Sequence, residues 1–302
     1  MVRIRQSLVV LLLTLIMQIS FAHRCERIVT LSPALTTIID EMGLAENLVG
    51  HSEYSLLPTG LNSVEVGSYF NLNLEQLYRL KPTMIFLEQS DEGKTVAKMK
   101  KLGLPAQTIL LNTLDEIEAS YANISAACGF SPDDLTGEKA LVKTDLSAQQ
   151  NRLTDQGNGL VFYGDGRAYE LDLPTLAVGK SFHRDLFNYL GLTLLYDGPL
   201  NAPTLNSEAL FALNPDWIII LNGDSAANYD TLEQLTVRNI EVKWPRLEGM
   251  NAVKNGQVYE LKGYWSMMPT PRAMESIAEQ VITVLDQSES PNSIDKQKEN
   301  IQ

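Results

Sequence analysis

The sequence predicts an α/β fold of two similar lobes, because one segment occurs twice, 133 positions apart. Residues 73–87 read NLEQLYRLKPTMIFL and residues 206–220 read NSEALFALNPDWIII. Each copy has the pattern of a short amphipathic helix, a turn marked by proline and a buried strand. A helix followed by a buried strand is half of a parallel βαβ unit, so we expect a parallel sheet in each lobe.

The two copies place a glutamate at the same position of the expected helix, Glu75 in one and Glu208 in the other. A carboxylate in the first helical turn suits the helix dipole, and this alone explains many such residues. The same residue at both sites, amid divergent surroundings, also suits a ligand carrier that docks on a symmetric partner. The identical positions are Asn73/Asn206, Glu75/Glu208, Leu77/Leu210, Leu80/Leu213, Pro82/Pro215 and Ile85/Ile218.

Residues 1–22 have the pattern of a cleavable signal peptide. Arg3 and Arg5 precede the apolar run LVVLLLTLIM, which is short for a membrane span, and Ser20-Phe21-Ala22 resembles a cleavage site. We therefore expect a periplasmic protein that starts at His23; a retained N-terminal anchor is the alternative.

The formal charge of the chain is −13, and removal of the signal peptide with its two arginines makes it −15. This acidity argues against nucleic acid or anionic lipid as a partner. The remaining 280 residues exceed the usual size of a single core and suit two lobes.

The first lobe is expected over residues 23–131. It opens with the strand RIVTLSP, a helix that ends at Gly43 and the strand LVGH. The first repeat copy follows, with its strand MIFL. The segment KTVAKMKKLGLPA predicts a helix, QTILL a strand and LDEIEASYANISAAC a final helix.

Residues 132–157 are polar, with sparse leucines and few glycines, and predict a long helix joining the lobes. About twenty helical residues span about 30 Å, enough to cross a two-lobe molecule; a flexible linker is the alternative. The second lobe, 158–287, is expected to run from the strand GLVFYG through the helix SFHRDLFNYLG, the second repeat copy and the strand VYELKG to the helix AMESIAEQVITVLD. The polar residues 288–302 predict a disordered tail.

The chain has two cysteines, Cys25 and Cys128. An exported chain meets an oxidising compartment, so we predict a disulfide between the start of the first strand and the end of the helix at 114–128. Two unpaired buried thiols are the alternative.

No motif for catalysis or for a resident metal stands out. The stretch Val178–Ser181 reads VGKS, but Pro174 occupies the place of the first glycine of a phosphate-binding loop. The three histidines, His23, His51 and His183, are scattered, whereas a protein metal site gathers several ligands. We therefore predict a protein that is not an enzyme and has no cofactor or metal of its own.

Three segments, RIVTLSPALT, GLAENLVGHSEYSLLP and VGSYFNLNLEQLYRLKPTMIFL, together resemble the class III periplasmic substrate-binding proteins. That family serves ABC importers of cobalamin, haem and ferric siderophores, and the resemblance runs from about Arg27 to Asp286. It implies two α/β lobes joined by a single long α-helix, with the ligand in the cleft between them. It also implies that Glu75 and Glu208 engage arginines of a permease dimer in the inner membrane.

Within the family, the pattern is most similar to the cobalamin-binding type. Tyr54, Tyr69, Trp265 and Arg272 match positions that line the cleft in that type. Three other positions depart from it: a tyrosine is replaced by Leu57, a tryptophan by Ala202 and an acidic residue by Tyr264. Cobalamin and a ferric siderophore therefore both stay open as ligands, with haem third.

The sequence thus predicts a monomeric carrier that delivers a metal chelate to an ABC importer. Two alternatives remain: an exported enzyme on a related scaffold, and an interaction module whose cleft no longer binds a ligand.

Overall fold

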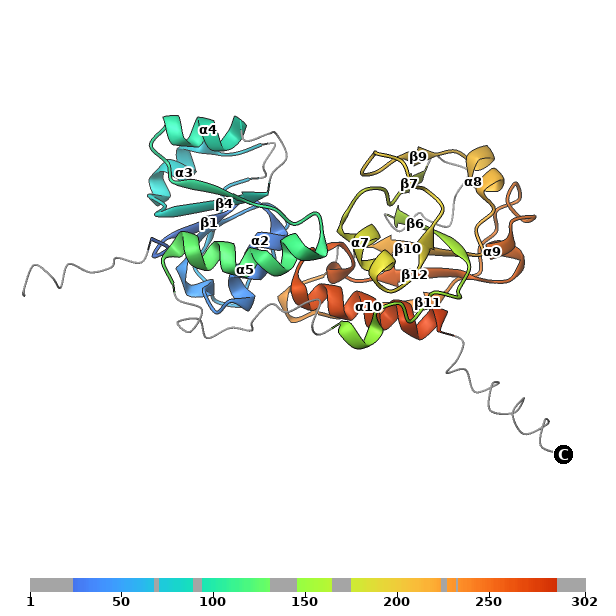
Figure 1. Cartoon of the computed structure of the whole chain (residues 1–302). Helices are drawn as coiled ribbons and strands as arrows, with labels where there is room; N and C mark the ends of the chain where they lie inside the picture. The colour runs from blue at the N-terminus through green and yellow to red at the C-terminus, as the bar shows by residue number, and fades with distance from the viewer. Residues whose placement is uncertain are drawn as a thin grey trace, which may run out of the picture.

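A computed structural model describes residues 24–67, 71–88, 94–130, 146–164, 175–223, 227–231 and 233–286. Two α/β lobes lie side by side (Figure 1), which confirms the predicted fold class. The expected signal peptide and tail lie outside the described residues, and so does Tyr69.

The first lobe is built on a parallel sheet of five strands in the order β3-β2-β1-β4-β5. The central strand β1 is fully buried, as its apolar sequence predicts. In chain order the strands are β1 (Ile28–Thr30), β2 (Leu48–His51), β3 (Val64–Glu65), β4 (Met84–Glu88) and β5 (Ala106–Ile109).

The helices of this lobe begin at residues suited to cap them. The Oγ of Ser32 accepts a hydrogen bond from the backbone N–H of Leu35, and Pro33 occupies the first helical position of α2. Thr113 caps α5 in the same way, and Gly129 ends it in the left-handed conformation. The helices are α2 (Pro33–Glu41), the 3-10 turn η1 (Ala45–Asn47), α3 (Leu74–Leu80), α4 (Lys94–Lys101) and α5 (Leu114–Cys128).

The sheet of the second lobe is mixed, so the prediction of a purely parallel sheet is wrong here. Its strand order is β11-β12-β10-β6-β7-β9, with β8 beside β6. The inner strands β6, β10 and β12 are parallel, whereas β7 and β11 run antiparallel to their neighbours. The strands are β6 (Asn158–Gly164), β7 (Thr175–Ala177), β8 (Thr193–Leu194), β9 (Thr204–Leu205), β10 (Trp217–Asn222), β11 (Thr236–Asn239) and β12 (Val258–Lys262).

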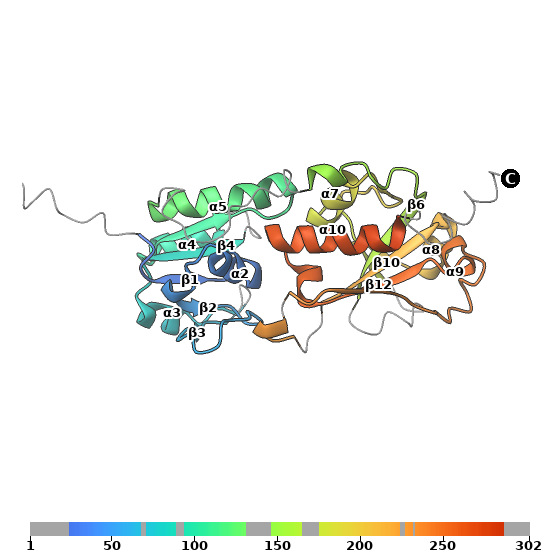
Figure 2. The same ribbon diagram turned by 90° about the horizontal axis from the view of Figure 1, so that it is seen from below.

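Helices cover both faces of this sheet, and Figures 1 and 2 both place the last helix, α10, beside α7. Thr270 caps α10, and Pro271 takes its first position. The helical elements are α7 (Phe182–Tyr189), α8 (Ser207–Leu213), the 3-10 turn η4 (Tyr229–Thr231), α9 (Asn251–Lys254), the 3-10 turn η5 (Tyr264–Met267) and α10 (Pro271–Leu285).

One apolar core continues from lobe to lobe, and each lobe has a second core on its outer side. The shared core joins residues of α2 and α5 to residues of α7 and α10. The outer core of the first lobe contains Leu77 of α3, and that of the second contains Leu210 of α8. The two repeat helices therefore cover equivalent cores.

The helix expected over residues 132–157 is wrong in its second half; residues 131–145 lie outside the described part of the chain. Residues 146–157 form the 3-10 turn η3 (Ser147–Gln149) and a series of further turns. The backbone N–H groups of Asn151 and Leu153 donate to carbonyls of Tyr189 and Leu190 in the second lobe. These bonds to the lobe take the place of bonds within a helix.

Cys25 and Cys128 form a disulfide, as predicted. Both residues are fully buried in the shared core. The bond ties the entry of the first strand to the last turn of α5, and the backbone N–H of Arg24 donates to the carbonyl of Cys128 beside it. The first lobe is thus closed by a covalent link between its two ends.

Candidate functional site: an interlobe cleft and two matched surface helices

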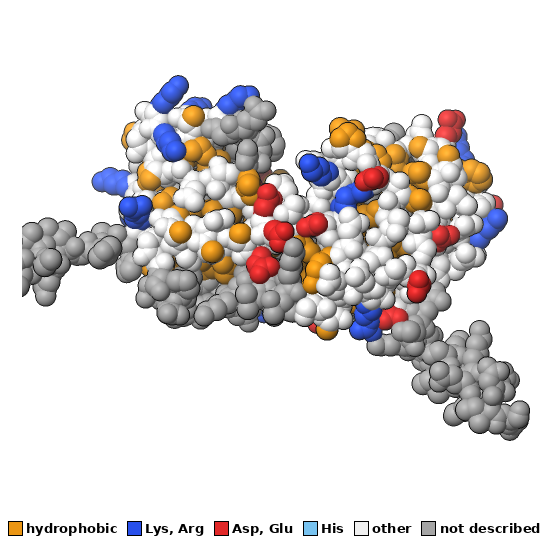
Figure 3. All heavy atoms as spheres, viewed as in Figure 1, with side chains coloured by type: hydrophobic (Ala, Val, Ile, Leu, Met, Phe, Trp, Pro, Cys, Tyr) orange, Lys and Arg blue, Asp and Glu red, His pale blue; other side chains and the backbone are white. Residues whose placement is uncertain are grey.

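The carboxyl ends of the inner strands of both sheets face the junction between the lobes. Tyr54 lies just after β2 in the first lobe, and Tyr264 follows β12 in the second. The hydroxyl of Tyr264 donates to the carbonyl of Tyr54 at 3.2 Å, across 210 positions of sequence. Figure 3 shows the surface hollowed between the lobes on its upper side. Ligands of open α/β sheets bind outside the carboxyl ends of the strands, so this junction is the candidate ligand cleft.

The structure brings two of the predicted ligand residues together, Trp265 and Arg272. The guanidinium carbon of Arg272 lies 5.4 Å from the centre of the Trp265 ring, which is the geometry of a cation–π contact. Arg272 also pairs with Glu233 at 3.0 Å. Trp265 itself is buried.

Tyr54 presents its ring to solvent, with 76 % of the residue exposed. Its backbone φ is +64°, which is rare for a residue with a side chain and fixes a sharp turn after β2. A large exposed ring at the mouth of a cleft suits stacking on a broad ligand. The fourth predicted ligand residue, Tyr69, lies outside the described residues.

Tyr264 explains one departure from the cobalamin-binding pattern. It stands where that pattern has an acidic residue, and here its buried hydroxyl reaches the first lobe. Burial raises the pKa of Tyr264 to about 12. The hydroxyl therefore stays protonated and works as a hydrogen-bond donor between the lobes.

Three more polar contacts hold the lobes together. Tyr229 donates to the carboxylate of Asp40 at 2.7 Å, and Thr270 donates to that of Glu41 at 3.1 Å. The other oxygen of Glu41 accepts from Tyr121 of α5 at 2.5 Å. Asp185 of the second lobe accepts from the backbone N–H of Leu114 at 2.7 Å. With the shared apolar core, these bonds resist hinge motion and favour a preformed cleft.

The sequence analysis missed a group on the wall of the second lobe around His183. Its Nε2 lies 2.7 Å from the carbonyl of Ser266, its Nδ1 lies 3.4 Å from the hydroxyl of Tyr163, and its ring stacks on Phe182 at 3.9 Å. Burial lowers the pKa of His183 to about 4, so the ring is neutral at physiological pH. The sequence signal for this group was weak: Tyr163 lies one residue before the end of the apolar strand β6.

A second missed residue, Glu88, ends the inner strand β4 of the first lobe. Burial raises the pKa of its carboxyl, and a hydrogen bond with Ser32 opposes that shift. Glu88 therefore stands at the carboxyl end of its strand, the side of an open α/β sheet on which ligands bind.

The two repeat copies fold into equivalent helices on the outer sides of the lobes. The side chains of Asn73 and Asn206 each accept a hydrogen bond from the backbone N–H three residues later. Helices α3 and α8 each have seven residues, and Lys81 and Asn214 end them with φ of +46° and +45°. The two repeat copies therefore have the same local structure.

Glu75 and Glu208 lie exposed in the first turns of these helices. Figure 1 places α3 and α8 on the upper side of their lobes. Glu75 pairs with Arg79 at 2.6 Å, and it borders a depression of about 400 Å³. No ion pair holds Glu208 among the described residues.

The described residues lack two other features. No cluster of three or more histidine, cysteine or acidic residues could hold a metal ion there. None of the helices in these ranges combines the length and hydropathy that crossing a bilayer requires.

Comparison with known proteins finds relatives of one kind. Residues 28–131 match the periplasmic binding protein family model. The vitamin B12-binding protein of Vibrio cholerae is 28 % identical over 86 % of this chain and 89 % of its own length. The Fe(3+)-citrate-binding protein YfmC of Bacillus subtilis is 26 % identical over 81 % of this chain and 74 % of its own length.

Solved structures show the same fold. The periplasmic vitamin B12 binding protein BtuF of Vibrio cholerae has a TM-score of 0.67 and 24 % identity over 88 % of this chain and 98 % of its own. The periplasmic heme binding protein HutB of the same organism has a TM-score of 0.66 and 18 % identity over 86 % and 98 %.

The fold, the matched carboxylates and these relatives agree with the resemblance seen in the sequence. In sequence and in fold the chain is similar to the class III periplasmic substrate-binding proteins.

Proposed function

We propose that this protein captures a metal-bearing chelate outside the cytoplasm and delivers it to an ABC permease in the inner membrane. The observation that carries the proposal is the pair of exposed carboxylates, Glu75 and Glu208, on equivalent helices of two lobes that share a cleft. A two-fold permease offers two equivalent surfaces, and a duplicated carrier matches them. The relatives bind small molecules, which speaks against the alternative of an exported enzyme.

A corrinoid is the first candidate for the ligand. The vitamin B12-binding relatives align over most of the chain. The exposed ring of Tyr54 offers a face for a large flat ligand, and Arg272 at the junction offers a planar donor for its polar side groups. The interlobe bonds hold this site ready, so little free energy is lost in closing it.

A ferric chelate is the second candidate, and specific features favour it. Leu57 and Ala202 replace two aromatic residues of the cobalamin-binding pattern, which reduces the stacking surface. Arg272 would attract the anionic groups of a ferric citrate or catecholate. One relative is a ferric citrate-binding protein.

Titration calorimetry with cobalamin, ferric citrate, a ferric catecholate, a ferric hydroxamate and heme tests the proposal. We expect one of them to bind with a dissociation constant in the micromolar range or below, about −8 kcal/mol. Binding of none of them below about 1 mM, or turnover of any of them, would overturn it.

Two variants separate the candidates. Arg272→Gln keeps a planar hydrogen-bonding group but removes the positive charge, so it weakens an anionic ferric chelate more than cobalamin. Tyr54→Ala removes the exposed ring, so it weakens cobalamin more.

A further inference from the structure

Beside each docking carboxylate stands an exposed aromatic residue. Tyr78 is 53 % exposed and Phe211 is 50 % exposed. Each follows its glutamate by three positions, so ring and carboxylate lie on neighbouring parts of one helix face. Both rings occupy the same position of the repeat.

Both rings are exposed although each helix also has a buried apolar face. In each helix the residue just before the ring, Leu77 or Leu210, is fully buried and fills the outer core of its lobe. The rings therefore point outward because the inward positions are already taken. Large apolar side chains left in solvent at two matched places indicate a surface that is covered in a complex.

Both rings are held in place before any partner arrives. The hydroxyl of Tyr78 donates to the carbonyl of Leu102 at 2.6 Å, which anchors the ring beside the end of α4. Phe211 leans on Gly249, where an added Cβ would lie 3.1 Å from the ring. A ring that is already ordered loses little entropy on binding, which is typical of residues that dominate an interface.

We propose that Tyr78 and Phe211 are the apolar anchors of the permease-docking surface, one for each half of the permease dimer. This rests on the proposed function. Each half of the partner offers a cation to the carboxylate and an apolar recess to the ring next to it. A two-fold partner follows from the duplication, because two equivalent patches on one chain match two equivalent subunits.

The negative charge of this surface argues against two other partners, a second copy of the chain and an anionic bilayer. A second copy of the chain would bring acidic molecules together, since each carries a formal charge of −13 over the full sequence. An anionic bilayer would repel the two carboxylates in the same way. A cationic site framed by apolar surface complements both parts of each patch.

The test measures ligand binding and permease binding separately for the double variant Tyr78→Ala/Phe211→Ala. The probes are the cobalamin and ferric-chelate permeases of the source organism, reconstituted in nanodiscs. We expect the dissociation constant for the permease to rise about thirtyfold, since two interface aromatics are removed. Ligand affinity and the thermal midpoint of the second lobe should stay as in the wild type.

The matched control is Tyr78→Phe/Phe211→Tyr, which keeps both rings and moves the hydroxyl from one helix to the other. It should bind the permease as the wild type does. Wild-type affinity in the alanine variant would overturn the anchors and leave the proposed function standing. A wild-type protein that binds its ligand but none of the permeases would overturn both. If the wild type is a homodimer and the alanine variant is a monomer, the rings serve self-association instead.

Discussion

The two repeat copies differ most where they face solvent. Helices α3 and α8 have the same length, the same asparagine cap and the same buried leucine. Position 79 is an arginine that pairs with Glu75, whereas the equivalent position 212 is alanine and leaves Glu208 unmatched within its helix. The duplication has kept the carboxylate and the ring, and it has changed the charge around them.

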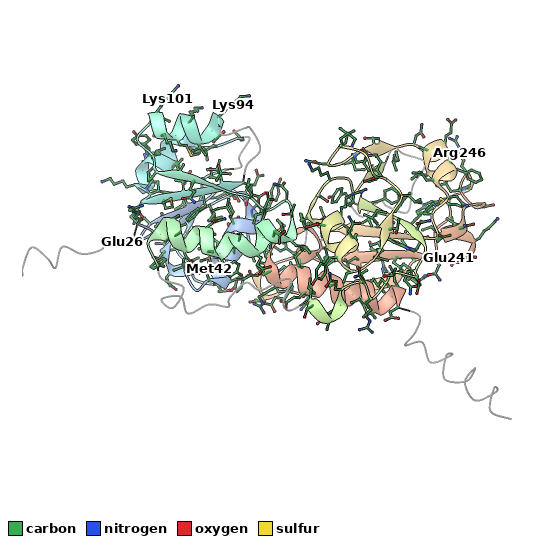
Figure 4. All side chains as sticks on the ribbon, viewed as in Figure 1. Glu26, Met42, Lys94, Lys101, Glu241 and Arg246 are labelled. Atoms are coloured by element: carbon green, nitrogen blue, oxygen red, sulfur yellow. A yellow bond between two sulfur atoms is a disulfide. The ribbon has the colours of Figure 1, made fainter. Side chains whose placement is uncertain are left out.

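Charged residues near the two helices add to the difference in charge between α3 and α8. Helix α4 carries lysines at positions 94, 98, 100 and 101, and its end contacts Tyr78. Figure 4 shows Lys94 and Lys101 on the upper edge of the first lobe, and Arg246 at the corner of the second lobe near α8. The carboxylate of the first lobe thus pairs with a cation of its own helix, and the same lobe carries the lysines of α4. We infer that the two halves of a permease meet unequal charges.

Reversal of both charges should have the largest effect. The double variant Glu75→Lys/Glu208→Lys should abolish stimulation of the permease while ligand affinity is unchanged, because each site then repels its cationic partner. ATPase assays of the reconstituted permease measure this, and calorimetry provides the control. Stimulation at the wild-type level would refute a docking role for both carboxylates.

Loss of the disulfide should separate the stabilities of the two lobes. Only the first lobe has such a bond, and it joins residues 103 positions apart. In the chain-entropy model a loop of this length contributes about 4.7 kcal/mol, so Cys25→Ser/Cys128→Ser should lower the free energy of unfolding by about that amount.

Urea unfolding of this variant, followed by hydrogen exchange of each lobe, checks the prediction. Amides of the first lobe should lose protection, and those on β10 and β12 should keep it. Equal loss in both lobes would mean that the shared core couples them into one unit.

Neutral single variants should reveal the inequality of the docking sites. Glu208→Gln should weaken permease binding about tenfold, whereas Glu75→Gln should weaken it about threefold, because Arg79 already neutralises Glu75 in part. Surface plasmon resonance with the reconstituted permease measures both. In Arg79→Ala, substitution of Glu75 should cost as much as substitution of Glu208. Equal losses in the wild-type background would show that Arg79 turns away on docking.

The sequence was sufficient for features with a local or repeated signal. The duplication predicted two helices with exposed glutamates, and the two cysteines predicted their bond. Features that depend on distant partners could not be predicted. Residues 146–157 have helix-forming composition, yet their backbone bonds to the second lobe hold them in turns. The polar edge strand β11 lacks the apolar run that marks an inner strand.

The candidate cleft shows the same limit. Trp265 and Arg272 are only seven positions apart, and the structure places them in contact. The hydrogen bond from Tyr264 to the carbonyl of Tyr54 joins residues 210 positions apart, so no local sequence pattern could predict it. The buried pair of His183 and Ser266 is also a contact between distant segments.

The smallest expected effect concerns how the two repeat helices end. Lys81 and Asn214 both adopt the left-handed conformation, which asparagine tolerates better than lysine and glycine tolerates best. Lys81→Gly should therefore raise the free energy of unfolding by about 0.5–1 kcal/mol, whereas Asn214→Gly should change it by only a few tenths. Chemical denaturation of the two single variants measures the contrast. A gain for Asn214→Gly as large as that for Lys81→Gly would show that the end of each helix is set by the following Pro82 and Pro215 rather than by the residue at the turn.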